Sequence, residues 1–417
     1  MIHMNTDDRA PERWGPHDWA VVLAGGQGLR IAHLTLNDAN VSVPKQFCSL
    51  GRGSALVHEA LLRARAAAPL DRTLLTVTQS HRAWWQDLGN FLQPENLLVQ
   101  PEQRGTGIAV LHSLLEVMRH DPAASLAILP ADHYFRDEAV IASGLRAAMA
   151  LTRKFPQQIL LLAFEPEDVD PDLGYIMPIA ARGEDLCEVS RFCEKPGLDE
   201  VRTLIDQGAL CNSFILAASG RALLDLFERH CPAVVTRLSD FVAAPLDPAA
   251  RREELARLFG GIPSIDFSEE IVAAETSNLR VLRLPACGWS DLGTPARLQR
   301  VLRRHGTAID KAPVAPESMR GHLDLAKRSR ATIPCKYERN PSETPMQADP
   351  ALDEIEEMFD RIDENGDSSI SFEEFTSLML ELDHTRPASA LSASFAAIDS
   401  DHNGRVSFDE FHAWVTR

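Results

Sequence analysis

Short apolar runs alternate along the first 305 residues with longer segments in which apolar side chains recur at helical spacing. The short runs predict buried strands, and the longer segments predict helices that cover them. We expect strands at residues 20–24, 74–77, 97–99, 126–129 and 159–164, and helices at residues 55–68, 108–119 and 140–153. This alternation is typical of a Rossmann-like α/β domain with a mostly parallel sheet. Its ligands are then expected at the carboxyl ends of the strands.

The chain divides into four segments of different composition. Residues 1–18 form a polar tail, and residues 19–305 form the α/β domain. Residues 306–350 contain six prolines in a mixed-charge stretch with little periodicity, which predicts a linker. Helical periodicity returns in residues 351–417, where we expect a small all-α domain.

Charge separates the C-terminal segment from the rest. Residues 351–417 hold sixteen acidic residues against four arginines and no lysine, so they carry −12 of the total net charge of −18. Nonspecific binding of nucleic acid needs a cationic surface, so we expect no nucleic-acid partner. Two units of different composition are joined in one chain.

The cysteines and the N-terminus indicate the compartment. Seven cysteines are scattered without a CxxC pair, which favours free thiols in a reducing environment. The N-terminus lacks the apolar stretch of a signal peptide, and no apolar run approaches the ~20 residues that span a bilayer. We therefore expect a cytoplasmic protein with no membrane span. The oligomeric state stays open, a homo-oligomer included.

Two acidic loops repeat 36 residues apart in the C-terminal segment. Each places oxygen ligands at the positions that suit Ca²⁺, including a carbonyl at position 7 and a final glutamate that binds through both oxygens. The expected Ca²⁺ ligands are Asp363, Asn365, Asp367, Ser369 and Glu374 in the first loop, and Asp399, Asp401, Asn403, Arg405 and Glu410 in the second. An acidic turn between helices would explain one such loop, but two in register resemble an EF-hand pair.

Details of the two loops lead to further expectations. Ile370 and Val406 occupy position 8 of their loops, where a short strand couples paired loops. The first loop has Ser368 at position 6, where glycine normally makes the sharp turn, so we expect weaker binding there. The second loop has Gly404 at that position.

A glycine-rich loop follows the first predicted strand. The run Gly25-Gly26-Gln27-Gly28-Leu29-Arg30 lets backbone N–H groups approach phosphates, and Arg30 adds a positive charge. It fits neither a dinucleotide fingerprint nor a Walker-type loop, and by itself it also leaves a simple tight turn open.

Further motifs follow in a fixed order. They are Pro44-Lys45-Gln46-Phe47, the segment from Gln100 to Gly107, Leu129-Pro-Ala-Asp132-His133, Leu173-Gly174-Tyr-Ile, Phe192-Cys-Glu194-Lys195-Pro, Asn212-Ser213 and Gly288-Trp-Ser-Asp291-Leu-Gly. Together they resemble the sugar-nucleotide pyrophosphorylases, most closely the bacterial mannose-1-phosphate guanylyltransferases, over about residues 19–302.

The resemblance implies an enzyme that joins a nucleoside triphosphate, GTP first, to a sugar 1-phosphate, mannose 1-phosphate first, and releases pyrophosphate. It implies the catalytic residues Arg30, Lys45, Asp132, Lys195 and Asp291, with Mg²⁺ held by Asp132 and Asp291. The implied nucleotide site comprises Leu23, Ala24, Gly25, Gly26, Gly28, Arg30, Lys45, Gln100, Arg104, Thr106 and Gly107. The implied sugar site comprises Gly174, Glu194, Lys195 and Asn212.

The chain also departs from that family. Leu29 stands where threonine is usual, Phe214 follows Asn212-Ser213 where glycine is usual, and Gln100 stands where glutamate is usual. EF-hand loops take the place of the isomerase-type domain that is often fused to the mannose enzymes. A calcium-modulated transferase is the hypothesis that we favour.

Three alternatives stay open at this stage. The fold has lost catalysis and acts as a calcium-dependent interaction module, or the same chemistry uses UTP, ATP or CTP with another sugar phosphate. Taken singly, Asp132 and Asp291 also fit helix N-caps before Glu138 and Pro295.

Overall fold

The computed structural model describes residues 14–37, 40–50, 54–86, 88, 92–179 and 186–305, with residues 362, 369–372, 375, 376, 395, 398, 405–407 and 411 of the C-terminal region. The chain divides into two compact units. One comprises Met1–Leu292 and Thr307–His322, and the other comprises Gly293–Gly306 and Leu323–Arg417. Among the described residues, no helix is both long and apolar enough to cross a membrane.

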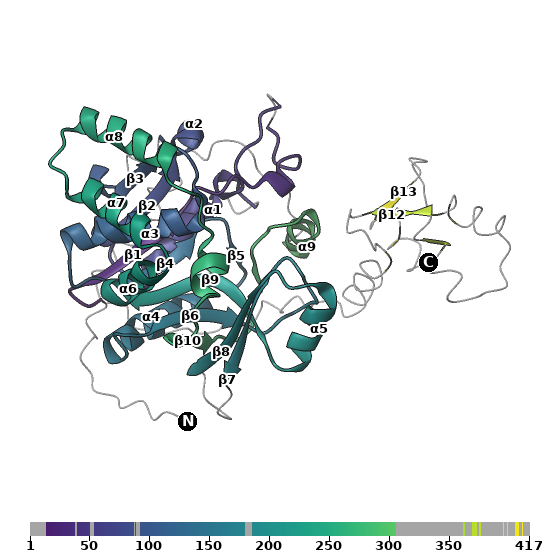
Figure 1. Ribbon diagram of the computed structural model, residues 1–417. Coiled ribbons are helices and arrows are strands. Elements are labelled where there is room, and N and C mark those ends of the chain that lie inside the picture. The colour runs from purple at the N-terminus through teal and green to yellow at the C-terminus, as the bar shows by residue number, and fades with distance from the viewer. Residues whose placement is uncertain are drawn as a thin grey trace, which may run out of the picture. The chain divides into compact units, whose positions relative to one another are not determined.

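A nine-stranded sheet forms the centre of the first unit in the described part of the chain (Figure 1). Its strands are β1 Asp18–Leu23, β2 Thr73–Thr78, β3 Leu97–Gln100, β4 Ser125–Pro130, β6 Ile159–Phe164, β7 Gly174–Ile179, β8 Leu186–Glu194, β9 Leu210–Ser219 and β10 Leu279–Arg283. They lie in the order β3-β2-β1-β4-β9-β6-β10-β8-β7. Only β8 and β9 run against the direction of the others, since every antiparallel pairing involves one of these two strands. The expected α/β class with a mostly parallel sheet is confirmed.

Helices cover both faces of this sheet. Those of the first unit are α1 Leu56–Ala64, α2 Arg82–Trp85, α3 Gly105–His120, α4 Glu138–Lys154, α5 Leu198–Asp206, α6 Gly220–His230, α7 Pro232–Ala243 and α8 Pro248–Gly261. One core cluster combines α3, α6, α7 and α8 with alternate strand residues such as Val21, Leu126 and Ile128. Helices α1 and α4 pack against each other and against β1 and β4, on the other face.

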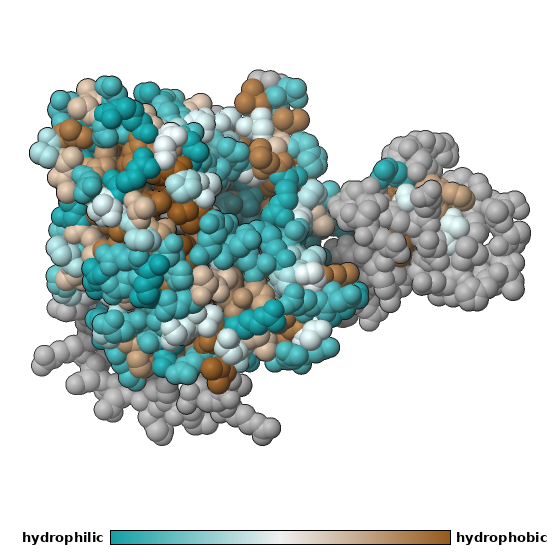
Figure 2. Space-filling view, in the orientation of Figure 1, coloured by the Kyte–Doolittle hydropathy of each residue, from teal (hydrophilic) through white to brown (hydrophobic). Residues whose placement is uncertain are grey.

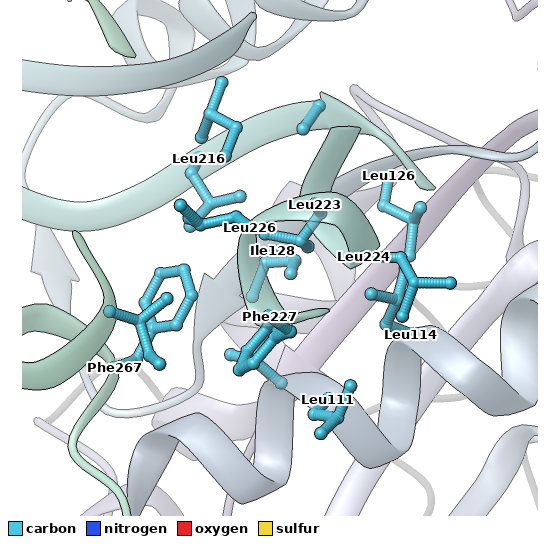
Figure 3. Close-up of a cluster of buried hydrophobic side chains, with 14 of the residues drawn as sticks. Leu111, Leu114, Leu126, Ile128, Leu216, Leu223, Leu224, Leu226, Phe227 and Phe267 are labelled. Atoms are coloured by element: carbon cyan, nitrogen blue, oxygen red, sulfur yellow. The ribbon is translucent and has the colours of Figure 1, made fainter. Parts of the chain in front are cut away.

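The large core cluster is built from aliphatic and aromatic side chains. Figure 3 shows Leu111 and Leu114 of α3 and Phe227 of α6 around Leu126 and Ile128 of β4. All five side chains are buried. Close packing of this kind holds the strand ends rigidly, and the strand ends carry the loops of the candidate site.

Polar residues begin several helices. Asp137 precedes α4 and accepts a hydrogen bond from Ala139 N–H (3.0 Å), Ser219 caps α6, and Asp247 caps α8 ahead of its first-turn proline. Asp132 is therefore not the N-cap of α4, as the sequence alone allowed, because Asp137 takes that place.

The carboxyl ends of β1 and β4 lie side by side. Leu23 pairs with Pro130, and Ala131 N–H donates to the Leu23 carbonyl (2.9 Å). The glycine-rich loop after β1 and Asp132 after β4 therefore emerge at the same edge of the sheet. A short ribbon of β5 Tyr134–Phe135 and β11 Trp289–Ser290 lies beyond it and leads into Asp291.

The second unit contains α9 Pro295–His305 and a short antiparallel ribbon of β12 Ser369–Ser371 and β13 Arg405–Ser407. Ile370 pairs with Val406, which confirms the coupling expected between the two loops. These two side chains are buried with Ile362, Phe375, Phe395, Ile398 and Phe411. Of the ten expected Ca²⁺-ligand positions, Ser369 and Arg405 lie in the ribbon, and the other eight lie outside the described residues.

Candidate active site

The glycine-rich loop is held in place by a buried glutamine. The Gln46 side-chain amide donates to the carbonyls of Ala24 and Gly26, at 2.9 Å each. Gly28 has a φ of +60°, a left-handed conformation that favours glycine. A Cβ on Gly26 would lie 3.9 Å from Asp132 Oδ2, so the bare backbone passes close to this carboxylate. The loop thus has the shape needed for phosphate binding through backbone N–H groups.

A lysine joins the two aspartates at the floor of the site. Lys45 Nζ lies 2.9 Å from Asp132 Oδ2 and also donates to the backbone carbonyl of Asp291. Burial opposes ionisation of Asp132, but Lys45, His133 and a backbone hydrogen bond together outweigh this effect and lower the pKa of the carboxyl. Asp132 is therefore a carboxylate at neutral pH, and 29% of its side chain stays exposed.

His133 holds the loop beside this cluster. Burial lowers the pKa of His133 to about 4, so the imidazole is neutral at pH 7. Trp289 Nε1 donates to His133 Nδ1 (3.2 Å), which places the remaining ring proton on Nε2, 4.0 Å from Asp132 Oδ1. The Trp289 ring also stacks on Phe164. His133 therefore contributes an oriented neutral ring and no charge.

A second carboxylate lies across the site on β8. Glu194 is 14% exposed, and Lys195 Nζ lies 3.2 Å from its Oε1. Burial raises the pKa of the Glu194 carboxyl, and Lys195 acts against this rise. A Cβ on Gly174 would lie 2.6 Å from Glu194 Oε2, so only glycine leaves room for this carboxylate. Asn212 Oδ1 accepts a hydrogen bond from Phe214 N–H (3.1 Å).

The segment after β3 packs against a distant loop. Gly107 N–H donates to the Ile265 carbonyl (2.8 Å), and a Cβ on Gly105 would lie 2.2 Å from that oxygen. Arg104 pairs with Glu102 at 2.7 Å. Gln100 is buried, and its Nε2 has no hydrogen-bond partner among the described residues.

These elements enclose one cavity of about 300 Å³. Most residues expected from the sequence line it, namely Leu23, Gly25, Gly26, Arg30, Gln100, Thr106, Asp132, Gly174, Glu194, Lys195, Asn212 and Asp291. Ala24, Gly28, Lys45, Arg104 and Gly107 are not part of the lining. Lys45 still reaches Asp132, whereas Gly107 contacts the Ile265 segment.

Several lining residues carried no functional signal in the sequence. Asp172 pairs with Arg30 (3.1 Å), and Asp266 accepts hydrogen bonds from two N–H groups of the π-helical turn Phe267–Val272. Gln46 lies within the motif Pro44-Lys45-Gln46-Phe47, but only the structure shows that it holds the glycine-rich loop. Asp266 comes from a stretch with no motif, so tertiary packing alone brings it to the cavity.

Phe214 occupies an unusual position in the lining. Its φ is +57°, which disfavours a side chain with a Cβ. Its ring meets Phe267 edge-on, with centroids 6.0 Å apart. Glycine would adopt the same backbone without strain, so the Phe214 side chain lines the cavity at an energetic cost.

Exposed apolar residues lie beside the glycine-rich loop. Leu29 is 73% exposed and Val41 is 51% exposed. Figure 2 shows hydrophobic residues gathered on the projecting segment that Figure 1 draws in dark purple. Leu29 therefore presents an apolar side chain to solvent where a hydroxyl is usual.

Comparison with known proteins identifies relatives of the first 305 residues. The chain is 28% identical over 295 residues to the xanthan biosynthesis protein XanB of Xanthomonas campestris, covering 69% of this chain and 60% of that protein. It is 26% identical over 296 residues to the mannose-1-phosphate guanylyltransferase of Escherichia coli, covering 68% and 59%. The chain thus spans about 60% of the length of these curated relatives.

Solved structures agree with the fold. A crystal structure from Thermus thermophilus, titled as a mannose-1-phosphate geranyltransferase, matches with a TM-score of 0.58 and 26% identity, covering 68% of this chain and 79% of that chain. A structure from Helicobacter pylori, titled as a mannose-6-phosphate isomerase, matches with a TM-score of 0.51 and 19% identity, covering 66% and 99%. At that identity the second match shows the fold alone.

Two family models match the chain. The model described as EF-hand domain pair matches residues 352–416. The model described as nucleotidyl transferase matches residues 19–305, which is more than half of the chain and contains every residue of the cavity lining. The chain therefore belongs to the nucleotidyl transferase family and carries an EF-hand domain pair behind its transferase domain.

Proposed function

We propose that this protein joins a nucleoside triphosphate to a sugar 1-phosphate and releases pyrophosphate. The supporting observation is the arrangement of one cavity, in which the glycine-rich loop, Asp132 and Asp291 face Glu194 and Lys195. The loop suits phosphates, and the opposite wall offers a carboxylate and a cation for a sugar phosphate. A cavity of about 300 Å³ is at the lower end of the range for small-molecule sites.

The reaction is an in-line displacement at phosphorus. An oxygen of the sugar phosphate attacks the α-phosphorus and forms the new P–O bond, while the bond from the α-phosphorus to the bridging oxygen breaks and pyrophosphate leaves with the electron pair. The attacking phosphate is already ionised, so no general base is needed. The protein must instead hold two anions together and in line.

The proposed roles follow from where each side chain lies. The loop Gly25–Gly28 binds the triphosphate through N–H groups, and Arg30 and Lys45 neutralise it. Lys195 meets the sugar phosphate, and Glu194 accepts hydrogen bonds from sugar hydroxyls beside Gly174 and Asn212. Leu23, Gln100 and Thr106 line the side of the cavity assigned to the nucleotide.

The donor set fits Mg²⁺. Asp132 is ionised and partly exposed to the cavity, Asp291 lines the same cavity, and carboxylate oxygens are the ligands that Mg²⁺ prefers. When bound between them, Mg²⁺ would neutralise phosphate charge and align the two substrates. Lys45 holds the two residues together through the Asp132 carboxylate and the Asp291 carbonyl.

GTP and mannose 1-phosphate are the substrates that we propose first. The support is the 26% identity to the mannose-1-phosphate guanylyltransferase of Escherichia coli. Transfer from UTP, ATP or CTP to another sugar phosphate is the second candidate, because Gln100 and Phe214 differ from the usual residues at the nucleotide and sugar sides. A catalytically inactive interaction module is the third, and Leu29 is the departure that favours it.

The test is pyrophosphate release by purified full-length protein with GTP, mannose 1-phosphate and Mg²⁺, followed by a panel of other nucleotides and sugar phosphates. We expect release, and a loss of at least about a hundredfold in kcat for Asp132→Asn and Asp291→Asn, as for removal of a strong electrostatic contact. Silence across the whole panel would favour the inactive module. Unchanged turnover in both variants would show that the metal assignment is wrong.

The EF-hand pair leads us to propose calcium binding and calcium-modulated activity. The proposed ligands are the ten loop residues from Asp363 to Glu374 and from Asp399 to Glu410 that are named above. The pairing of Ile370 with Val406 supports a coupled pair of loops. The same assay with and without micromolar Ca²⁺ tests modulation, and an unchanged rate would restrict the pair to calcium binding.

A further inference from the structure

Phe214 lies at an irregularity of β9 beside the candidate active site. The register between β9 and β6 shifts after Leu162, because Leu162 pairs with Ile215 whereas Ala163 pairs with Asn212. β9 therefore holds extra residues at this point, and Phe214 is one of them. Bulges of this kind are frequent next to active sites, where they redirect a side chain. Here the redirected side chain is half-buried and lines the cavity.

Hydrogen bonds fix the backbone of this bulge. Phe214 N–H donates to Asn212 Oδ1 (3.1 Å). Ile215 N–H donates to Ser213 Oγ (3.2 Å), and that hydroxyl donates to the Leu162 carbonyl. The surrounding structure thus holds Phe214 at its positive φ of +57°. Strained backbone of this kind persists where neighbouring contacts enforce it, and it is concentrated at functional sites.

The ring of Phe214 is anchored to the core. It meets the Phe267 ring edge-on, with centroids 6.0 Å apart, and the Phe267 ring lies 5.7 Å from that of Phe227. Phe267 and Phe227 belong to the large core cluster, and both are fully buried (Figure 3). Phe267 N–H also donates to Thr106 Oγ1 (2.8 Å). Because interiors are close-packed, the Phe214 ring cannot swing out of the cavity without disturbing this stack.

The ring lies beside the groups assigned to sugar hydroxyls. A Cβ on Gly174 would lie 2.6 Å from Glu194 Oε2 and 3.4 Å from Asn212 Cβ, so these three residues form one tight wall. The hydrogen bond from Phe214 N–H to the Asn212 side chain places Phe214 at the edge of this wall. The whole cavity measures about 300 Å³. A bulky group in place of a hydroxyl would therefore meet an aromatic ring that cannot yield.

We propose that Phe214 is a specificity-determining residue, which admits sugar 1-phosphates with free hydroxyls and excludes those that carry an acylated amino group. The acceptor class is then the plain hexose 1-phosphates, and the N-acetylhexosamine 1-phosphates are rejected by their bulk. This inference rests on the proposed function, because it assigns the sugar phosphate to the side of the cavity that contains Glu194 and Lys195.

Three substitutions separate the ring from the backbone. Phe214→Gly removes the ring and the strain, whereas Phe214→Ala removes the ring and keeps a Cβ at the positive φ. Asn40→Gly is the matched control, because Asn40 also has a positive φ, of +58°, but is exposed and is not part of the cavity lining. It relieves the same backbone strain far from any expected contact with the sugar.

The experiment is calorimetric titration of the full-length protein with sugar phosphates alone, so the measurement does not depend on turnover. The probes are glucose 1-phosphate with N-acetylglucosamine 1-phosphate, and mannose 1-phosphate with N-acetylmannosamine 1-phosphate. In the wild type and in Asn40→Gly, we expect the plain hexose phosphate to bind at least about tenfold more tightly than its acetamido partner, as for added bulk in a packed site. Phe214→Gly and Phe214→Ala should both lose this preference.

The outcomes separate this inference from the proposed transfer reaction. A preference that is equal in the wild type and Phe214→Gly would overturn the inference, as would a wild type that binds both members of each pair equally. A preference lost in Phe214→Gly but kept in Phe214→Ala would assign it to the backbone and also overturn the role of the ring. Absence of binding by every probe would overturn both this inference and the proposed sugar side. The expected preference without pyrophosphate release would support the inference and count against the transfer reaction.

Discussion

The glycine beside the candidate sugar carboxylate has no room for a side chain unless that carboxylate moves. A Cβ on Gly174 would lie 2.6 Å from Glu194 Oε2 and 3.4 Å from Asn212 Cβ. Gly174→Ala should therefore displace Glu194 and lower kcat/KM for the sugar phosphate at least about tenfold, the effect of misplacing one polar contact. Steady-state kinetics with varied sugar phosphate checks this expectation.

Gly197 provides the control for that substitution. Its φ is −62°, and a Cβ there would meet nothing within 4 Å. Gly197→Ala should leave the kinetics unchanged, because the added methyl group meets nothing. Equal kinetic losses in both variants would mean that Gly174 has no special relation to Glu194.

The buried carboxylate Glu194 should make stability depend on pH. Its pKa in the folded protein is raised, mainly by burial, above the usual 4.5. The folded state therefore binds a proton more tightly than the unfolded state, and stability falls as pH rises from about 4.5 through the raised pKa. Glu194→Gln should remove this loss, so its stability relative to the wild type should increase across that window.

Urea unfolding of both proteins between pH 4 and pH 8 measures this difference. A stability difference that does not change with pH would contradict the burial of an ionisable group at this position. Activity should fall in Glu194→Gln at every pH, because an amide accepts fewer hydrogen bonds from sugar hydroxyls than a carboxylate does.

At the scale of elements, two aspartates near the start of α4 have separable tasks. Asp137 caps the helix through Ala139 N–H, whereas Asp132 faces the cavity. Asp137→Ala should lower the free energy of unfolding by about 1 kcal/mol and leave activity largely intact. Asp132→Asn should lower activity and leave the free energy of unfolding largely unchanged. Urea unfolding and pyrophosphate release on the same preparations test both expectations, and a loss of activity in Asp137→Ala alone would reverse the assignment.

The sequence predicted one half of the sheet well and the other half hardly at all. The uninterrupted apolar runs 20–24, 74–77, 97–99, 126–129 and 159–164 became β1, β2, β3, β4 and β6 within two residues. Strands buried on both faces produce such runs. In β8, by contrast, buried and exposed residues are mixed, and its partner β10 lies far away in the sequence. No local pattern encodes that pairing.

The candidate site shows a similar division. Residues at strand ends, such as Asp132 and Glu194, were identified because motifs surround them. The roles of Gln46 and Asp266 were not predicted. Gln46 acts on backbone carbonyls, and Asp266 reaches the cavity only through the packing of its turn. The positive φ of Phe214 is likewise a property of the folded backbone and has no signature in the sequence.

At the scale of the whole molecule, the two acidic loops predict unequal calcium sites. The second loop has Gly404 at its sixth position, whereas the first has Ser368. Isothermal titration calorimetry of the full-length protein should therefore resolve a tighter and a weaker Ca²⁺ site. Glu410→Gln should weaken the tighter site at least about tenfold, and Glu374→Gln should affect the weaker one. A tighter site that survives Glu410→Gln would place it in the first loop.

The bridge that Lys45 forms between Asp132 and the Asp291 carbonyl has a consequence for the order in which substrates arrive. A bare divalent cation would meet the ammonium group, and a bare triphosphate would meet two carboxylates, so each alone is opposed by part of the site. When the cation is already chelated by the triphosphate, the cation meets the carboxylates and the phosphate oxygens meet the ammonium group in the same encounter. Under the proposed function, the resting ion pair would favour entry of metal and nucleotide as one complex.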